Sequence, residues 1–142
     1  PYQRWADRTE PLTPSPLGLR LHPQHGLWHA YRLALLLPQR IAAPEARDAP
    51  AAPAEKAAEK APGACATCPS LCVKGCPVGA HDHGFNLQTC VAHLRTPEGQ
   101  TCLQQGCQAR AACPEGAASK YLPDHATFHM QAFAARHLHE TD

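Results

Sequence analysis

Eight cysteines, all between residues 65 and 113, are the side chains of this sequence with the clearest capacity for chemistry. They form two blocks of the pattern C-x10-C-P-x-G-A, which begin at Cys65 and Cys102, with Cys90 between the blocks. Thiolates bind soft metals, pair as disulfides or act as redox couples. The repeat therefore predicts metal, disulfide or redox chemistry in this one segment.

The duplicated ending in Cys-Pro resembles the two-cluster bacterial ferredoxins, in which the last cysteine of each block ligates the other block's iron–sulfur cluster. The second block has only three cysteines, so Cys90 completes the count. The resemblance implies two 4Fe–4S clusters as cofactors. We expect one cluster to be bound by Cys65, Cys68, Cys72 and Cys113, and the other by Cys76, Cys90, Cys102 and Cys107.

The residues around the cysteines are compatible with such sites. Several glycines lie one to three positions from a cysteine, where the backbone would pass close to a cluster and donate N–H groups to its sulfur atoms. Val73 and Leu103 are candidates for an apolar shell. Lys74 and Arg110, the cations inside the two blocks, are expected to be solvated surface charges.

Three other uses of the cysteines compete with iron–sulfur binding. Structural zinc usually takes paired C-x2-C knuckles, whereas only Cys65 and Cys68 have that spacing. A disulfide framework also needs an even cysteine count, but the repeat and its confinement to one segment favour metal. A redox-active pair needs a C-x2-C motif near a βαβ unit, which is not predicted here. A zinc- or disulfide-stapled interaction module remains an alternative.

The chain also resembles the double-cluster ferredoxin module of epoxyqueuosine reductases and corrinoid-dependent reductive dehalogenases, and stand-alone ferredoxin-like proteins of proteobacteria. The likeness covers about residues 16–117. It is carried by the following elements: the Leu-His-Pro-Gln-His-Gly-Leu-Trp segment at 21–28, the block ending Cys76-Pro77-Val78-Gly79-Ala80, Cys90 within Thr-Cys-Val-Ala-His-Leu, and Gly106-Cys107 through Cys113-Pro114.

The chain differs from these families in two respects. Both cysteine blocks are longer than the common C-x2-C-x2-C-x3-C-P pattern, and no segment is long enough to be a corrinoid site. The chain begins at Pro1 rather than Met, which predicts a fragment or a processed form. A second hypothesis is therefore the electron-feeding domain of a cobalamin-dependent reductase whose corrinoid domain lies outside this chain.

Composition limits the remaining possibilities. The 142 residues include only 6% aromatics and 15 prolines, so a small core is expected to need metal or disulfides. A formal charge of +1 without a basic patch argues against nucleic-acid binding. No apolar run is long enough for a membrane span, and no secretory signal is visible, so a cytoplasmic bacterial protein is expected.

The predicted fold class is α+β, a small and irregular two-cluster ferredoxin-like fold. Residues 1–43 form a hairpin segment, with strands at 17–21 and 31–35 around a turn at 22–26. Residues 44–62, rich in Ala, Pro, Glu and Lys, form a linker or insertion. Residues 63–117 form the dicluster module, with a helix capped by Asn86. Residues 118–142 provide a C-terminal helix that is capped by Asp124 and packs on the module.

Catalysis by this chain alone is not expected. Ten histidines are present, and His125 and His129 have the i, i+4 spacing of metal ligands, but no H-E-x-x-H motif accompanies them. Like His81 and His83, they are expected to be surface or packing residues. No nucleophile–base order or phosphate-binding glycine loop is present. The expected partners are a redox protein that donates electrons and one that accepts them.

Overall fold

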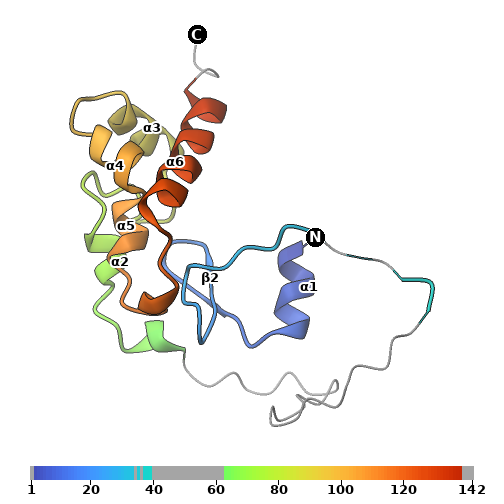
Figure 1. Cartoon of the computed structure of the whole chain (residues 1–142). Coiled ribbons are helices and arrows are strands. Elements are labelled where there is room, and N and C mark those ends of the chain that lie inside the picture. The colour runs from blue at the N-terminus through green and yellow to red at the C-terminus, as the bar shows by residue number, and fades with distance from the viewer. Residues whose placement is uncertain (1, 34, 36, 40–62, 139–142) are drawn as a thin grey trace.

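The computed structural model describes residues 2–33, 35, 37–39 and 63–138, and in this part the protein is a small, mostly helical domain (Figure 1). Its strands are β1 (Thr13–Pro14) and β2 (Arg20–Leu21). Its helices are α1 (Tyr2–Thr9), α2 (Leu71–Lys74), α3 (Leu87–Leu94), α4 (Gln100–Gln105), α5 (Gln108–Ala111) and α6 (Pro123–His137), with 3-10 turns η1 (Ala64–Ala66) and η2 (Ala117–Ser119). The predicted linker at 44–62 lies outside the described residues.

The N-terminal hairpin is confirmed, but the predicted pairing of its strands is wrong. β1 pairs antiparallel with β2, with Thr13 opposite Leu21, and residues 31–35 contribute no strand among the described positions. The turn closes because Ser15 N donates to Leu19 O at 3.0 Å and Gly18 adopts a φ of +75°. Leu33 and Leu35, which the period-2 alternation assigned to a half-buried strand, are instead exposed.

Helix α1 was not predicted, because its eight residues are mostly polar and no capping residue precedes it in the chain. It lies beyond the hairpin, away from α3, α4 and α6 (Figure 1). An ion pair between Asp7 and Arg20, 2.7 Å long, joins it to β2. Leu12, which follows the helix, is fully buried.

The helical part has two layers. α6 packs chiefly on α4 and also on α3, whereas α2 packs on α5. The predicted start of α3 is confirmed, since Asn86 Oδ1 accepts a hydrogen bond from Thr89 N at 3.0 Å. The C-terminal helix is also confirmed, but its predicted cap is wrong. Leu122 is the N-cap and Asp124 lies in the first turn, because Pro123, with its fixed φ, already occupies the first helical position.

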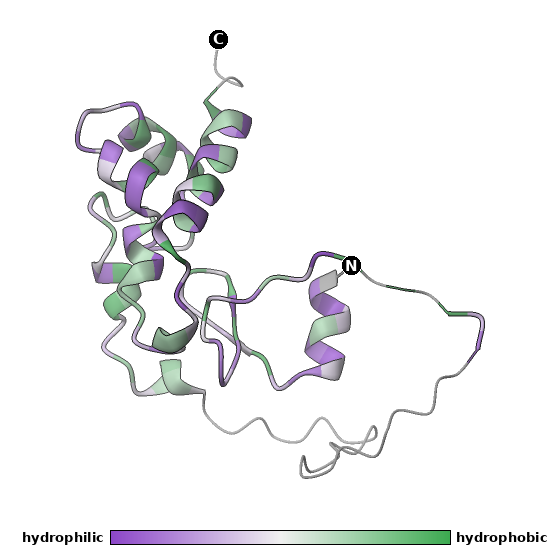
Figure 2. Cartoon of the chain, viewed as in Figure 1, coloured by the Kyte–Doolittle hydropathy of each residue, from purple (hydrophilic) through white to green (hydrophobic). Residues whose placement is uncertain are grey.

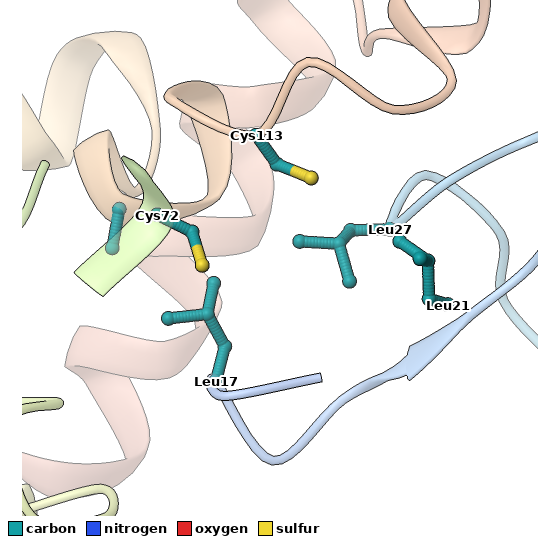
Figure 3. Close-up of a cluster of buried hydrophobic side chains, with 6 residues drawn as sticks. Leu17, Leu21, Leu27, Cys72 and Cys113 are labelled. Atoms are coloured by element: carbon teal, nitrogen blue, oxygen red, sulfur yellow. The ribbon is translucent and has the colours of Figure 1, made fainter. Parts of the chain in front are cut away.

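Two small cores hold these elements together, and cysteines belong to both. One contains Leu17, Leu21 and Leu27 from the hairpin segment with Cys72, Ala109 and Cys113 (Figure 3). The other contains Leu94, Cys102 and Ala134, with Cys90, Leu103, Met130, Phe133 and Leu138 packed against it. Three of the eight cysteines, Cys72, Cys102 and Cys113, are therefore buried in these cores, and the other five are partly exposed.

None of the described helices is long and apolar enough to cross a bilayer. Figure 2 shows hydrophilic and hydrophobic positions alternating along α6, the longest helix. Its apolar side contributes Met130, Phe133 and Ala134 to the second core.

Candidate metal centre

Four of the cysteines are electrostatic neighbours of one another at the hairpin end of the module. Cys65 interacts with Cys113, Cys72 and Cys68, and Cys72 interacts with Cys113 and Cys68. All four line one mostly apolar pocket with about 390 Å³ of empty space, part of it open to solvent. Figure 3 shows the sulfur atoms of Cys72 and Cys113 pointing towards the leucine side chains of the hairpin segment. We call these four residues the first cysteine group.

The other four cysteines are also neighbours of one another. Cys90 interacts with Cys107, Cys76 and Cys102, and Cys102 interacts with Cys107 and Cys76. Cys90 and Cys102 come from α3 and α4. Both pack near α6 in the second core. We call Cys76, Cys90, Cys102 and Cys107 the second cysteine group. The two groups have the same members as the two ligand sets expected from the sequence. The binding of a cluster by each group stays a prediction.

The packed helices α2 and α5 each serve both groups. α2 contains Cys72 of the first group and is followed by Cys76 of the second. α5 begins after Cys107 of the second group and is followed by Cys113 of the first. Because these two helices pack on each other, the two groups are held side by side. The two cysteine blocks therefore correspond to two packed helices. Each helix has a cysteine of one group near its start and a cysteine of the other group after its end.

Burial dominates the protonation chemistry of the thiols. Burial first, and then the neighbouring thiols Cys107, Cys76 and Cys102, raise the pKa of Cys90 from 9.0 to about 11. Burial is likewise the main reason that the pKa values of four other thiols are raised: Cys65, Cys72, Cys102 and Cys107. A buried thiolate is costly without a compensating positive charge, so these thiols stay protonated in the metal-free chain at neutral pH.

Backbone N–H groups point at several of the sulfur atoms. Ala80 N donates to Cys76 Sγ at 3.3 Å. Backbone hydrogen bonds from Gln108 to Cys102, and from Arg110 and Ala109 to Cys107, lower the pKa of the thiols that accept them. Four thiols around one space, with N–H donors on their sulfurs, form the donor set that a 4Fe–4S cluster requires. The residues present therefore fit the expected cofactor.

Cys113 is positioned by a close backbone contact between two distant segments. A Cβ at Gly26 would stand 2.1 Å from Glu115 O, and a Cβ at Gly116 would stand 2.3 Å from the carbonyl carbon of His25. Both glycines have positive φ, +54° and +68°. The turn of the hairpin segment is thus pressed against the loop that follows Cys113, a contact that only glycine permits at both positions.

Arg110 is not the solvated charge expected from the sequence. Its guanidinium lies 4.7 Å from the centre of the Trp28 ring and 4.6 Å from that of Tyr121. Its Nε donates to Leu27 O at 3.0 Å, its Nη2 donates to the same oxygen, and Nη2 also reaches the Tyr121 hydroxyl at 3.3 Å. The prediction failed because Leu27 and Trp28 lie more than 80 positions earlier in the sequence. Lys74, in contrast, is exposed as expected.

The histidines with ligand-like spacing pack against an aromatic ring. His125 Nε2 and His129 Nε2 are 3.0 Å apart, and both imidazoles stack on Tyr121. His81 stacks on Phe85, and His83 is exposed at the edge of a shallow pocket formed by residues 78–89. Within the described residues, no three His, Cys, Asp or Glu side chains form a site for a single metal ion.

All eight cysteines are free thiols. No family model, curated protein or solved structure matches the chain. The arrangement of the cysteines is therefore the principal evidence on function.

Proposed function

We propose that this protein is an electron-transfer protein that binds two 4Fe–4S clusters, one in each cysteine group. The observation that carries the proposal is the division of all eight cysteines into two groups of four, one lining a single pocket and the other made of four mutual neighbours. A 4Fe–4S cluster takes four thiolates, so the division uses every cysteine without remainder. The resemblance of the chain to two-cluster ferredoxin modules agrees with this assignment.

A bound 4Fe–4S cluster supplies a centre that gains and loses one electron. The chain's own residues do three things around it. The α2 and α5 helices keep the two groups adjacent, which shortens the path between them. Leucines such as Leu17 and Leu27 keep water away from the first group. Backbone N–H groups, such as that of Ala80 on Cys76, compensate the negative charge of the thiolates.

The same features favour a cluster over structural zinc or a disulfide framework. The thiolates on a cluster each bind a different iron atom, so they do not have to converge on a single point, whereas zinc draws its four ligands to about 2.3 Å from one ion. The described side chains contain no single-ion site of three or more ligands. The cysteines are free, which supports a role as ligands rather than as disulfide partners.

The test is the metal content of anaerobically purified protein. We expect about eight irons and as many acid-labile sulfides per chain, with a broad visible absorption that bleaches with dithionite. Cys90→Ser and Cys68→Ser, one change in each group, are each expected to lower the iron content. Zinc at high occupancy, or a colourless protein with no metal, would overturn the proposal.

A further inference from the structure

We propose that His22 is the positioning residue of the first cysteine group, and that it holds this group in place only while its imidazole is neutral. The inference rests on the proposed function, since it concerns the loop that would supply Cys113 to a cluster. His22 begins a turn that ends at Gly26. It acts through the backbone of this turn rather than as a ligand, because the turn is pressed against the loop after Cys113.

The imidazole of His22 closes the turn from within. Its Nδ1 accepts two backbone N–H groups, from Gln24 at 3.0 Å and from His25 at 3.1 Å. A backbone N–H can only donate, so Nδ1 is the unprotonated nitrogen of the ring, and the proton of the neutral form is on Nε2. An imidazolium would carry an N–H at Nδ1 that faces these two donors. Protonation therefore removes both hydrogen bonds.

The turn that His22 closes contacts the loop that follows the last cysteine. His22 and Gly26 exchange both backbone hydrogen bonds, at 2.9 and 2.8 Å. Gly26 lies so close to this loop that a Cβ there would stand 2.1 Å from Glu115 O. His25 adds a second link, because its Nδ1 is 3.0 Å from Ser119 Oγ. A change in the turn is therefore transmitted directly to the loop.

The residues that flank the turn cover the first cysteine group. Leu21 precedes the turn and Leu27 lies at its end, and both are buried. They pack with Cys72 and Cys113 in the first core, where the sulfur atoms of both cysteines point towards the leucines (Figure 3). If the turn opens, the first group loses this apolar cover together with the position of its last cysteine. The second group packs near α6 instead, so the effect is expected chiefly in the first.

Groups from three segments face the imidazole, and together they favour its neutral form. Glu10, after α1, lies 3.5 Å from Nε2, but the same carboxylate oxygen already accepts the Tyr31 hydroxyl at 2.9 Å. The ring of His25 stacks on that of His22 with the centroids 4.6 Å apart, and His29 lies 5.6 Å away. Burial is the main reason that the pKa of His22 is lowered from 6.5. His25 and His29 lower it further, and Glu10 opposes them.

Mild acid is expected to open the turn. Because the pKa of His22 is lower in the folded chain, the unfolded chain binds more protons as the pH falls. The stability that the neutral imidazole gives to the turn is therefore present above pH 6.5 and is lost as the pH falls below that value towards the lowered pKa.

Two substitutions separate the acceptor from the titration. His22→Asn places an amide oxygen as far along the side chain as Nδ1, so it can accept the same N–H groups but does not titrate. His22→Gln carries its amide one bond further out and has no acceptor at that place. His83→Asn, which replaces an exposed histidine, is the matched control. The native chain and the three variants are loaded with iron and compared between about pH 8 and about pH 5.5.

The measurements are hydrogen–deuterium exchange of residues 21–28, followed by mass spectrometry, and the release of iron to a chelator. At about pH 8 the native chain and His22→Asn should be alike, whereas His22→Gln should exchange on the order of tenfold faster and release about half of its iron early. At about pH 5.5 the native chain should behave like His22→Gln, and His22→Asn should keep its slow exchange. Comparison of the chains at the same pH removes the general effect of acid on exchange and on clusters.

The proposal is overturned if His22→Asn exchanges as fast as His22→Gln at every pH, because the acceptor would then not be what closes the turn. It is also overturned if the native chain stays protected in acid, or if His22→Asn loosens in acid together with it. An equal change in His83→Asn would make the effect a general one and would likewise overturn it. A chain that takes up no iron would defeat the proposed function, and the exchange of residues 21–28 would still decide on His22.

Discussion

Gly75, which follows α2, lies directly against Ala112, which follows α5: a Cβ at position 75 would stand 2.5 Å from the Ala112 Cβ and 3.2 Å from Gln108 O. The φ of Gly75 is −75°, so alanine would suffer no backbone strain there. Gly75→Ala would therefore lower the free energy of unfolding through overpacking alone. We expect it to destabilise the protein by about 1–3 kcal/mol and to loosen both cysteine groups. Thermal unfolding and iron content measure the two effects.

A second substitution tests whether the α2–α5 contact is the cause. Ala112→Gly removes the methyl group that the new Cβ would meet, at a cost of roughly 0.5–1 kcal/mol from the added backbone freedom. The double variant Gly75→Ala with Ala112→Gly is expected to be more stable than Gly75→Ala alone. Equal stability of the single and double variants would show that the spacing between the two helices is not what Gly75 maintains.

Gly116→Ala is expected to impair the first cysteine group selectively. A Cβ there would stand 2.4 Å from the backbone nitrogen of Gly26, and the loop that carries Cys113 would have to shift. Iron content should fall to about half, because the second group receives no ligand from this loop. Gly84→Ala is the matched control, since Gly84 also has a positive φ, +95°, but its Cβ would meet nothing within 4 Å. Equal iron loss in both variants would rule out the contact as the cause.

The Asn86 cap is expected to stabilise the helix that carries Cys90. Asn86→Ala removes the acceptor for Thr89 N and should lower the free energy of unfolding by about 1 kcal/mol. Asn86→Asp keeps a side-chain oxygen at the same place and should retain most of that stability. Urea unfolding of the two variants beside the native protein gives the comparison. A similar loss in both would mean that the amide acts by some contact other than capping.

The pKa of Cys90 predicts its reactivity in the metal-free chain. With a pKa of about 11 when folded and an ordinary value of 9.0 when unfolded, alkylation at pH 9 should be roughly fiftyfold slower in buffer than in urea. The sign for stability follows from the same shift. The unfolded chain releases this proton first, so the free energy of unfolding falls as the pH rises from 9.0 towards about 11. Equal alkylation rates in buffer and urea would contradict the burial of this thiol.

Local signals in the sequence predicted the elements that depend on local interactions. The α3 helix follows from Asn86 and the apolar spacing after it, and the C-terminal helix follows from its own amphipathic pattern. The hairpin partner was predicted wrongly, because the turn that joins the paired strands lies at residues 15–19, with Gly18 at a φ of +75°. Helix α1 is joined to the hairpin by the Asp7–Arg20 ion pair and buries Ala6, and the partners of these contacts lie in another segment of the chain.

The cysteines of the candidate site were predicted from the sequence, whereas the residues around them were not. The two blocks contain seven of the eight cysteines, and Cys90 lies between them. The electrostatic neighbours are different. Arg110 is held by Leu27 and Trp28, more than 80 positions earlier. Glu115 is simply the variable residue of a Cys-Pro-x-Gly-Ala ending. Only the folded chain brings the Arg110 guanidinium to its partners, so its position has no counterpart in the repeat.

Because α2 and α5 each supply cysteines to both groups, the order of synthesis decides when each group can form. During synthesis, Cys65, Cys68 and Cys72 leave the ribosome well before Cys113, and Cys76 leaves well before Cys107. Neither group can gather its four thiols until nearly the whole module has been translated and α5 has docked on α2. Cofactor insertion is therefore expected to be a late event, in which delivery to one group organises the other. A chain truncated before residue 107 would leave each group with only three of its four cysteines.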